Sequence, residues 1–115
     1  MNHPKAENRQ LKVVLIRQSF NNTITEEKAE ELKKKAVETL NVIEEALKAS
    51  FGRIPPEFEE VLQNLNQIDI RKAKAGYTVF YRYNITSRHM KYFKASYTED
   101  MRIKGVTNVM EKVRR

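Results

Sequence analysis

The spacing of apolar residues in the first half of the chain predicts one strand followed by a long helix. Residues 11–16 form a short, β-branched run that is apolar on both faces, which is typical of a strand buried inside a sheet. The apolar positions that follow recur at steps of three and four, which indicates a single helix of about 24 residues. Its stripe consists of Ala29, Leu32, Ala36, Leu40, Ile43 and Leu47. We expect the large residues of the stripe to pack on the sheet beside Val13 and Leu15.

Local signals predict where the helices begin and end. Thr23 stands three residues before Glu26, which is the spacing of a capping box, and Thr25 is the alternative N-cap. Gly52 and the two prolines after Ile54 end the long helix, since glycine accepts a left-handed C-cap and proline cannot continue the helical hydrogen bonds. The second proline then opens a shorter helix. Its apolar face consists of Phe58, Val61, Leu62 and Leu65.

From residue 68 onward the apolar period changes to two, which predicts strands. Residues 68–71, 77–84 and 89–97 read as three strands separated by tight links. A final basic helix is expected after residues 98–100, although Gly105 lowers the helix propensity there. The apolar positions of this helix are Met101, Val106, Val109, Met110 and Val113.

The predicted order is therefore β-α-α-β-β-β-α. It indicates an α+β fold in which one helical layer packs on a mostly antiparallel sheet. The length suits a single domain of residues 1–115. Residues 1–10 are polar, and we expect them to form a disordered tail.

The excess positive charge of the chain lies almost entirely in its second half. Residues 1–66 carry ten Lys/Arg and eleven Asp/Glu, a net charge of −1, whereas residues 67–115 carry twelve and four, a net charge of +8. Aromatic residues are interleaved with these cations. Cations neutralise phosphates and aromatic rings stack on bases, so the pattern predicts binding to RNA or DNA. The alternative is a basic surface that only keeps the protein soluble.

Several other function classes lack their characteristic residues. Without cysteine, neither a disulfide framework nor a cysteine zinc site can form. The sequence has no secretory leader and no apolar run of membrane length, so we expect a cytoplasmic protein with no membrane partner. It also has no Gly-rich phosphate loop, no nucleophile elbow and no cluster of metal ligands, and we therefore predict neither a metal nor another cofactor.

Alternation along the two aromatic strands separates two faces of the predicted hairpin. On the first strand, Tyr77, Val79, Tyr81 and Tyr83 lie opposite Thr78, Phe80 and Arg82. On the returning strand, Met90, Tyr92, Lys94 and Ser96 lie opposite His89, Lys91, Phe93, Ala95 and Tyr97. One face must pack on the helices, and the other would present cations and aromatics together, as in sheets that bind single-stranded RNA. Alternatively, the aromatics fill the core and the cations line a solvated face.

Basic residues of the second half are the candidate nucleic-acid contacts. They are Arg71, Lys72, Lys74, Arg88, Lys91, Lys94, Arg102 and Lys104. His89 is the only histidine outside the tail, and it could act as a general acid or base near neutral pH. The alternative for His89 is an ordinary surface residue at the tip of the hairpin.

The second half of the chain resembles one protein family. Residues 70–81 are similar to the strand–turn–strand of the RelE/ParE toxin superfamily, with a basic strand, then Gly76 and Tyr77, then an apolar run. Residues 90–97 match that family's next core strand, and the helical hairpin at residues 26–65 also fits. Thr78 stands where the family usually has arginine. The resemblance implies a metal-independent endoribonuclease toxin, with an acidic antitoxin as a further partner.

Carried onto this sequence, the resemblance assigns phosphate contacts to Lys72 and Lys74. It places Arg82 near the position of the missing arginine and makes Tyr97 the candidate acid or base. Together with His89, the catalytic candidates are thus Arg82, Tyr97 and His89. The rival hypothesis is a non-enzymatic mobile-element or phage protein that uses its basic face to bind a nucleic acid or an acidic partner protein.

Overall fold

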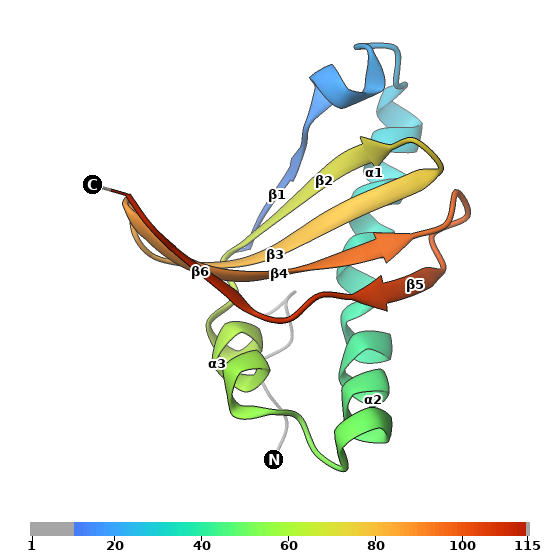
Figure 1. Ribbon diagram of the computed structural model, residues 1–115. Helices are drawn as coiled ribbons and strands as arrows, with labels where there is room; N and C mark the ends of the chain where they lie inside the picture. Colours follow the sequence, from blue (N-terminus) through green and yellow to red (C-terminus); the bar gives the residue numbers. More distant parts are fainter. Residues whose placement is uncertain (1–10, 115) are drawn as a thin grey trace.

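Helices cover one face of a six-stranded sheet in the computed structural model, which describes residues 11–114 (Figure 1). The α+β class and the mostly antiparallel sheet are thus confirmed, while the expected tail at residues 1–10 lies outside the described residues. The elements are β1 (Lys12–Leu15), a 3-10 turn η2 (Arg17–Phe20), α1 (Glu26–Glu38), α2 (Leu40–Phe51), α3 (Pro56–Asn64), β2 (Gln67–Ala73), β3 (Gly76–Thr86), β4 (His89–Tyr97), β5 (Ile103–Val106) and β6 (Met110–Val113).

The strands follow the order β1-β2-β3-β4-β5, and β6 also pairs with β4. Only β1 and β2 run parallel; the other pairs are antiparallel. No helix within residues 11–114 is both long and apolar enough to cross a membrane.

The long hairpin of β3 and β4 forms the centre of the sheet, and its two faces are those expected from alternation. Tyr81 lies opposite Phe93 and Tyr77 lies opposite Tyr97, and all four side chains are buried under the helices. At the start of β3, Gly76 has a φ of 110° and faces the Tyr97 carbonyl so closely that no Cβ would fit. Only glycine can therefore bring β3 this close to the end of β4.

The expected single helix is in fact two helices that meet at Thr39, so that prediction was wrong. The hydroxyl of Tyr81 donates to the Ala36 carbonyl at 2.9 Å, and the Thr39 hydroxyl bonds back to the Lys35 carbonyl at 2.9 Å. A threonine hydroxyl that competes for helix carbonyls bends a helix. Tyr97 contacts both the Thr39 hydroxyl, at 2.7 Å, and the Tyr81 hydroxyl. These three hydroxyl groups, which we call the hydroxyl cluster, join the helix junction to β3 and β4.

The apolar stripe of the helices is otherwise buried as expected, with one exception. Ala29, Leu32, Ala36, Ile43 and Leu47 lie in the core, together with Leu15 of β1. Leu40 begins α2 directly after the junction and is only half-buried, as is Val13, so these two residues pack at the margin of the core.

The N-cap of α1 is Thr25, the alternative considered from the sequence, so the prediction of Thr23 as the N-cap was wrong, whereas the C-cap at Gly52 is confirmed. Thr25 is the N-cap of α1 and accepts a hydrogen bond from the Lys28 amide at 3.1 Å, whereas the Thr23 hydroxyl donates to the Phe20 carbonyl. Gly52 ends α2 in the left-handed conformation, with a φ of 79°.

The final helix expected after residue 100 does not form; the chain continues as β5 and β6. Both strands pair with β4, β5 along Ala95–Tyr97 and β6 along His89–Tyr92. Between them, Thr107 accepts a hydrogen bond from the Lys94 amide at 3.0 Å and donates its own amide to the Lys94 carbonyl at 2.9 Å. These bonds satisfy backbone groups along the outer edge of β4, which a helix would leave unpaired. This tertiary gain exceeds the weak helix propensity around Gly105.

The difference between Leu32 and Leu40 can be measured. We expect Leu32→Ala to lower the free energy of unfolding by about 3 kcal/mol, because it leaves a cavity in a fully buried site. Leu40→Ala should cost roughly 1 kcal/mol, since less apolar area is lost from a half-buried position. Urea denaturation of both variants tests this, and equal losses would contradict the margin position of Leu40.

The hydroxyl cluster should make the protein sensitive to alkali. Burial raises the pKa of Tyr81 well above its ordinary value of 10.0, with a further rise from the neighbouring Tyr97, and burial also raises the pKa of Tyr97. Above about pH 10 the unfolded tyrosines lose protons that the folded protein retains. The stabilisation is therefore complete below about pH 10 and falls as the pH rises toward the folded pKa values.

Urea unfolding between pH 8 and 11 measures this loss. We expect Tyr97→Phe to flatten the alkaline decrease, whereas Tyr92→Phe, a control on the other face of β4, should retain it. If both variants keep the slope of the wild type, the cluster does not cause the alkaline instability.

Candidate nucleic-acid interface

The face of the sheet opposite the helices, which we call the open face, carries a grid of polar and aromatic side chains. Strand register sets four rows across β2, β3, β4 and β6. The rows are Arg71–Thr78–Ser96, Asp69–Phe80–Lys94, Gln67–Arg82–Tyr92–Met110 and Asn84–Met90–Lys112. Alternation along β3 and β4 thus places cations beside aromatic rings, as the sequence predicted.

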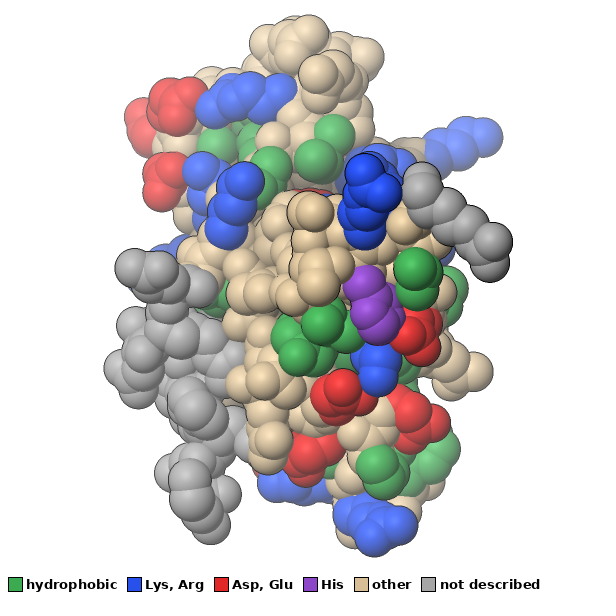
Figure 2. Space-filling view, turned by 90° about the vertical axis from the view of Figure 1, so that its left-hand side faces the viewer, with side chains coloured by type: hydrophobic (Ala, Val, Ile, Leu, Met, Phe, Trp, Pro, Cys, Tyr) green, Lys and Arg blue, Asp and Glu red, His purple; other side chains and the backbone are tan. Residues whose placement is uncertain are grey.

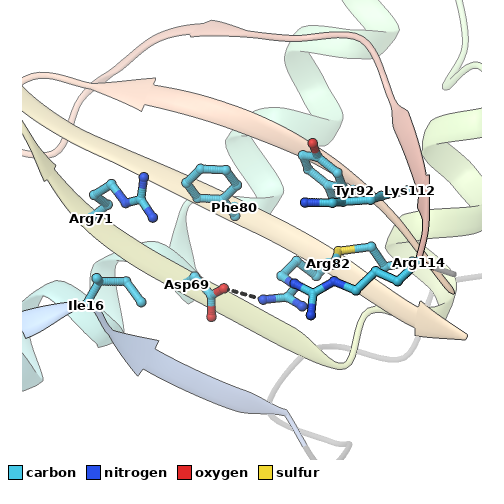
Figure 3. A pocket seen from close by; sticks show the side chains of 9 residues that line it. Ile16, Asp69, Arg71, Phe80, Arg82, Tyr92, Lys112 and Arg114 are labelled. Atoms are coloured by element: carbon cyan, nitrogen blue, oxygen red, sulfur yellow. Dashed lines mark hydrogen bonds and ion pairs between the residues drawn. The ribbon is translucent and has the colours of Figure 1, made fainter. Parts of the chain in front are cut away.

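A shallow groove of about 220 Å³ runs over the middle of this grid (Figure 3). Its lining comes from β2, β3, β4, β6 and the residues that follow β1 and β6. The lining residues are Ile16, Asp69, Arg71, Phe80, Arg82, Met90, Tyr92, Lys112 and Arg114. Figure 3 shows Phe80 between Arg71 and Tyr92, with Arg82 and Asp69 joined below them.

Arg82 lies at the centre of a closed network of side chains. Its Nη1 donates to Asp69 Oδ2 at 2.6 Å, and its Nη2 donates to Asn84 Oδ1 at 3.2 Å. Gln67 closes the ring, because its Nε2 donates to Asp69 Oδ1 at 2.7 Å and its Oε1 accepts from Asn84 Nδ2 at 2.9 Å. The Arg82 Nε is buried and has no partner among the described residues. The network holds the guanidinium in one orientation and offsets its charge with the Asp69 carboxylate.

Phe80 and Tyr92 form a partly exposed aromatic pair beside this network. Their ring centroids are 6.2 Å apart and the rings are tilted by 39°. Arg71 and Lys94 flank Phe80 from the neighbouring strands, at 5.5 and 5.7 Å from its ring centroid. Both cations lie over the Phe80 ring in cation–π contacts. Partly exposed rings of this kind can stack on bases, and the cations can meet phosphates.

Two cations of the groove were not among the sequence candidates. Lys112 lies on β6 opposite Met90, and Arg114 follows β6, where its amide donates to the Arg88 carbonyl at 2.6 Å. Both side chains are exposed and line the groove. The sequence analysis predicts a helix over residues 101–113, and in a helix alternate residues do not share a face. In the strand that forms instead, Met110 and Lys112 face the same side as Tyr92 and Met90.

Among the catalytic candidates, Tyr97 does not share a face with Arg82. It is fully buried under the helices, and its hydroxyl is engaged by Thr39 and Tyr81. A phenol in this position cannot reach a substrate on the open face, so the assignment of Tyr97 as acid or base is corrected to a core role.

His89 lies at the end of the hairpin and contacts Glu111 of β6 through its Nε2. Figure 2 shows the histidine against an acidic side chain on this side of the molecule. A second hollow at the hairpin end is lined by both Arg82 and His89, but the imidazole is held by Glu111. The structure therefore brings His89 near Arg82 without presenting it as a free base.

The eight candidate binding cations do not form one surface. Arg71 and Lys94 lie on the open face. Lys72 lies on the helix side, where its ammonium donates to the Ala73 and Gly76 carbonyls and sits 5.2 Å from the Tyr77 ring centroid. Its assignment as a phosphate contact on the same surface as Arg71 is thus not supported by the geometry.

Other cations of this set are paired or lie at the ends of the sheet. Lys91 donates to Glu60 of α3 at 2.9 Å, and this bond raises the pKa of Lys91. Arg102 pairs with Asp100 at 3.4 Å. The remaining three are exposed, Lys74 and Lys104 near the β2–β3 turn and Arg88 at the hairpin tip. In Figure 2 the basic side chains on this side are likewise interspersed with acidic and apolar ones.

The described part of the chain contains no group of three or more His, Cys, Asp or Glu side chains that could hold a metal ion. The charged or titratable side chains that line the groove are those of arginine, lysine, one tyrosine and one aspartate. No protein-family model, no curated protein and no solved structure matches this chain.

Proposed function

We propose that the protein binds RNA or DNA in the cytoplasm through the open face of its sheet. The observation that carries the proposal is the combination of outward cations with a partly exposed aromatic pair on the one face that the helices leave uncovered. The cations that point outward are Arg71, Lys94, Lys112 and Arg114, and we call them the outer cations. They supply attraction to phosphate, and Phe80 and Tyr92 supply stacking surfaces.

Two alternatives use the same charges differently. A surface that only aids solubility needs no aromatic rings between its cations, yet Phe80 lies between Arg71 and Lys94. An acidic partner protein, such as an antitoxin, would be attracted by the outer cations too. The aromatic pair favours a nucleic acid, because bases stack on rings whereas acidic side chains do not.

Binding should depend strongly on salt. If the four outer cations each contact one phosphate of a single strand, the slope of log affinity against log salt should be about −3, using about 0.7 per phosphate. We expect Arg71→Ala and Lys94→Ala each to weaken binding of any sequence and to reduce that slope by about 0.7. Fluorescence anisotropy with a labelled oligonucleotide measures both effects.

Lys34→Ala is the matched control for these variants, because Lys34 is an exposed cation on α1. It should leave both affinity and slope nearly unchanged. Absence of binding at low salt, or an equal effect of Lys34→Ala and Arg71→Ala, would refute the open face as the interface.

A finer proposal is that the groove also cleaves RNA, as the resemblance of residues 70–81 to the RelE/ParE superfamily implies. What supports it is Arg82, whose guanidinium is held in the groove by Asp69 and Asn84 and could stabilise the charge that develops on a phosphate. Tyr92 lies directly opposite Arg82 and is the only tyrosine on the open face. It replaces Tyr97 as the phenol that could move a proton.

Cleavage should survive excess EDTA and depend on Arg82. We expect Arg82→Ala to slow cleavage of free or ribosome-bound RNA by at least tenfold, and Arg82→Lys to recover little, since lysine lacks the planar guanidinium. Arg53→Ala, a cation between α2 and α3, serves as the control, and circular dichroism checks that each variant folds. If RNA stays intact with the wild type in both assays, the enzyme proposal fails and the binding proposal stands alone.

A further inference from the structure

We infer that the groove takes unpaired nucleic-acid strands with the bases turned toward the sheet and the phosphates along the outer cations, and that Asp69 enforces this orientation. The inference rests on the proposed nucleic-acid binding. It adds the class of ligand and the orientation of its bases and phosphates in the groove. It follows from how charge is distributed between the floor of the groove and its margins.

The floor of the groove carries almost no net charge. Asp69 is the one acidic side chain among the lining residues, and it is buried to 9 % exposure. It lies on β2, next to the strand that carries Phe80 and Arg82. Its carboxylate forms an ion pair with Arg82, the central cation. A phosphate that approached Arg82 from the groove would therefore meet a fixed carboxylate 2.6 Å from the guanidinium. Repulsion between the two anions disfavours phosphate at this position. The base-inward orientation and cleavage at Arg82 are therefore alternatives.

The margins of the groove are positive in contrast. Arg71 on β2 and Lys94 on β4 lie on either side of Phe80, and Lys112 and Arg114 extend from β6 at the other end. None of these four has an ion-pair partner among the contacts of the described residues. Phosphates are thus attracted to the margins, and the uncharged bases are left to contact the floor.

The floor also offers the groups that a base uses. Phe80 and Tyr92 provide two adjacent, partly exposed rings with centroids 6.2 Å apart (Figure 3). Bases stack on such rings only where they are unpaired, because the bases of a duplex already stack on their neighbours inside the helix. The amides of Gln67 and Asn84, which belong to the network around Arg82, line the second hollow, at the hairpin end. The ligand class is therefore single-stranded RNA or DNA.

A set of probes that differ in their bases and share the phosphate charge along each strand separates bases from phosphates. We would compare a labelled thymidine oligonucleotide, the same backbone with abasic sites, a blunt duplex and inorganic polyphosphate, by anisotropy at one low salt concentration. The inference predicts that the thymidine strand binds at least tenfold more tightly than the abasic strand and than the duplex. Equal binding of the normal and abasic strands overturns the base-inward orientation.

Two variants test the floor directly. Phe80→Leu should weaken binding of the thymidine strand about tenfold, as expected for loss of one stacked base, and change abasic binding less than twofold. Asp69→Asn removes the carboxylate charge with little change of shape, so that the charge of Arg82 is no longer offset. It should strengthen binding of the abasic strand and of polyphosphate at least threefold. The Asp69→Asn variant should therefore lower the ratio of thymidine to abasic affinity.

Matched controls lie on the helices. Phe51→Leu changes an exposed ring on α2, and Glu30→Gln removes an exposed carboxylate on α1; neither should alter the ratio of thymidine to abasic affinity. If Asp69→Asn acts no more strongly than Glu30→Gln, Asp69 does not set the orientation. Failure of the wild type to bind any of the four probes would instead refute the proposed function itself, so the two failures can be told apart.

Discussion

The hydroxyl cluster of Thr39, Tyr81 and Tyr97 is the contact on which the arrangement of helices and sheet depends. Two phenol hydroxyls are buried in the core, and burial of an unpaired hydroxyl is costly, so both must find partners there. The two phenols bond to each other, Tyr97 also bonds to the Thr39 hydroxyl, and Tyr81 donates to the Ala36 carbonyl. The helix junction is thereby fixed over the centre of the sheet. A slip of either strand by one residue would turn its tyrosine to solvent and bury its polar neighbours.

The same constraint creates the open face. Because strand side chains alternate, burying Tyr81 forces Phe80 and Arg82 outward, and burying Tyr97 and Phe93 does the same for Lys94 and its neighbours. Register then sets which outward residues meet across strands. It places the Asp69 carboxylate within reach of Arg82, where the pair is held by two amide side chains. A structural requirement of the core thus produces a groove with a nearly neutral floor.

The charge of the second half does not act as a single patch. Although residues 67–115 carry a net charge of +8, their cations point to both faces and both ends of the sheet. Lys72 is engaged by backbone carbonyls on the helix side, and Lys91 by Glu60. Net charge along a sequence therefore overestimates the charge of any one surface. What remains on the open face is a small set of cations placed around two rings, an arrangement better suited to a positioned ligand than to diffuse attraction.

Local sequence patterns were sufficient to determine the fold class, the short helix and the two faces of the hairpin. Helix stripes and strand alternation express the burial of individual side chains, which each segment encodes for itself. Alternation also grouped Phe80 with Arg82 on one strand and Tyr92 with Lys94 on the next. The register of the sheet then joined these two groups and Arg71 on one face. Only the tertiary structure decided the break at Thr39, the strands that replace the final helix, and the meeting of Asp69 with Arg82. Each of these features depends on a partner distant in the chain. The break at Thr39 follows from a tyrosine hydroxyl that bonds to a helix carbonyl, and the last strands form because the edge of β4 is otherwise unpaired. The contact of Asp69 with Arg82 follows from the register between two strands.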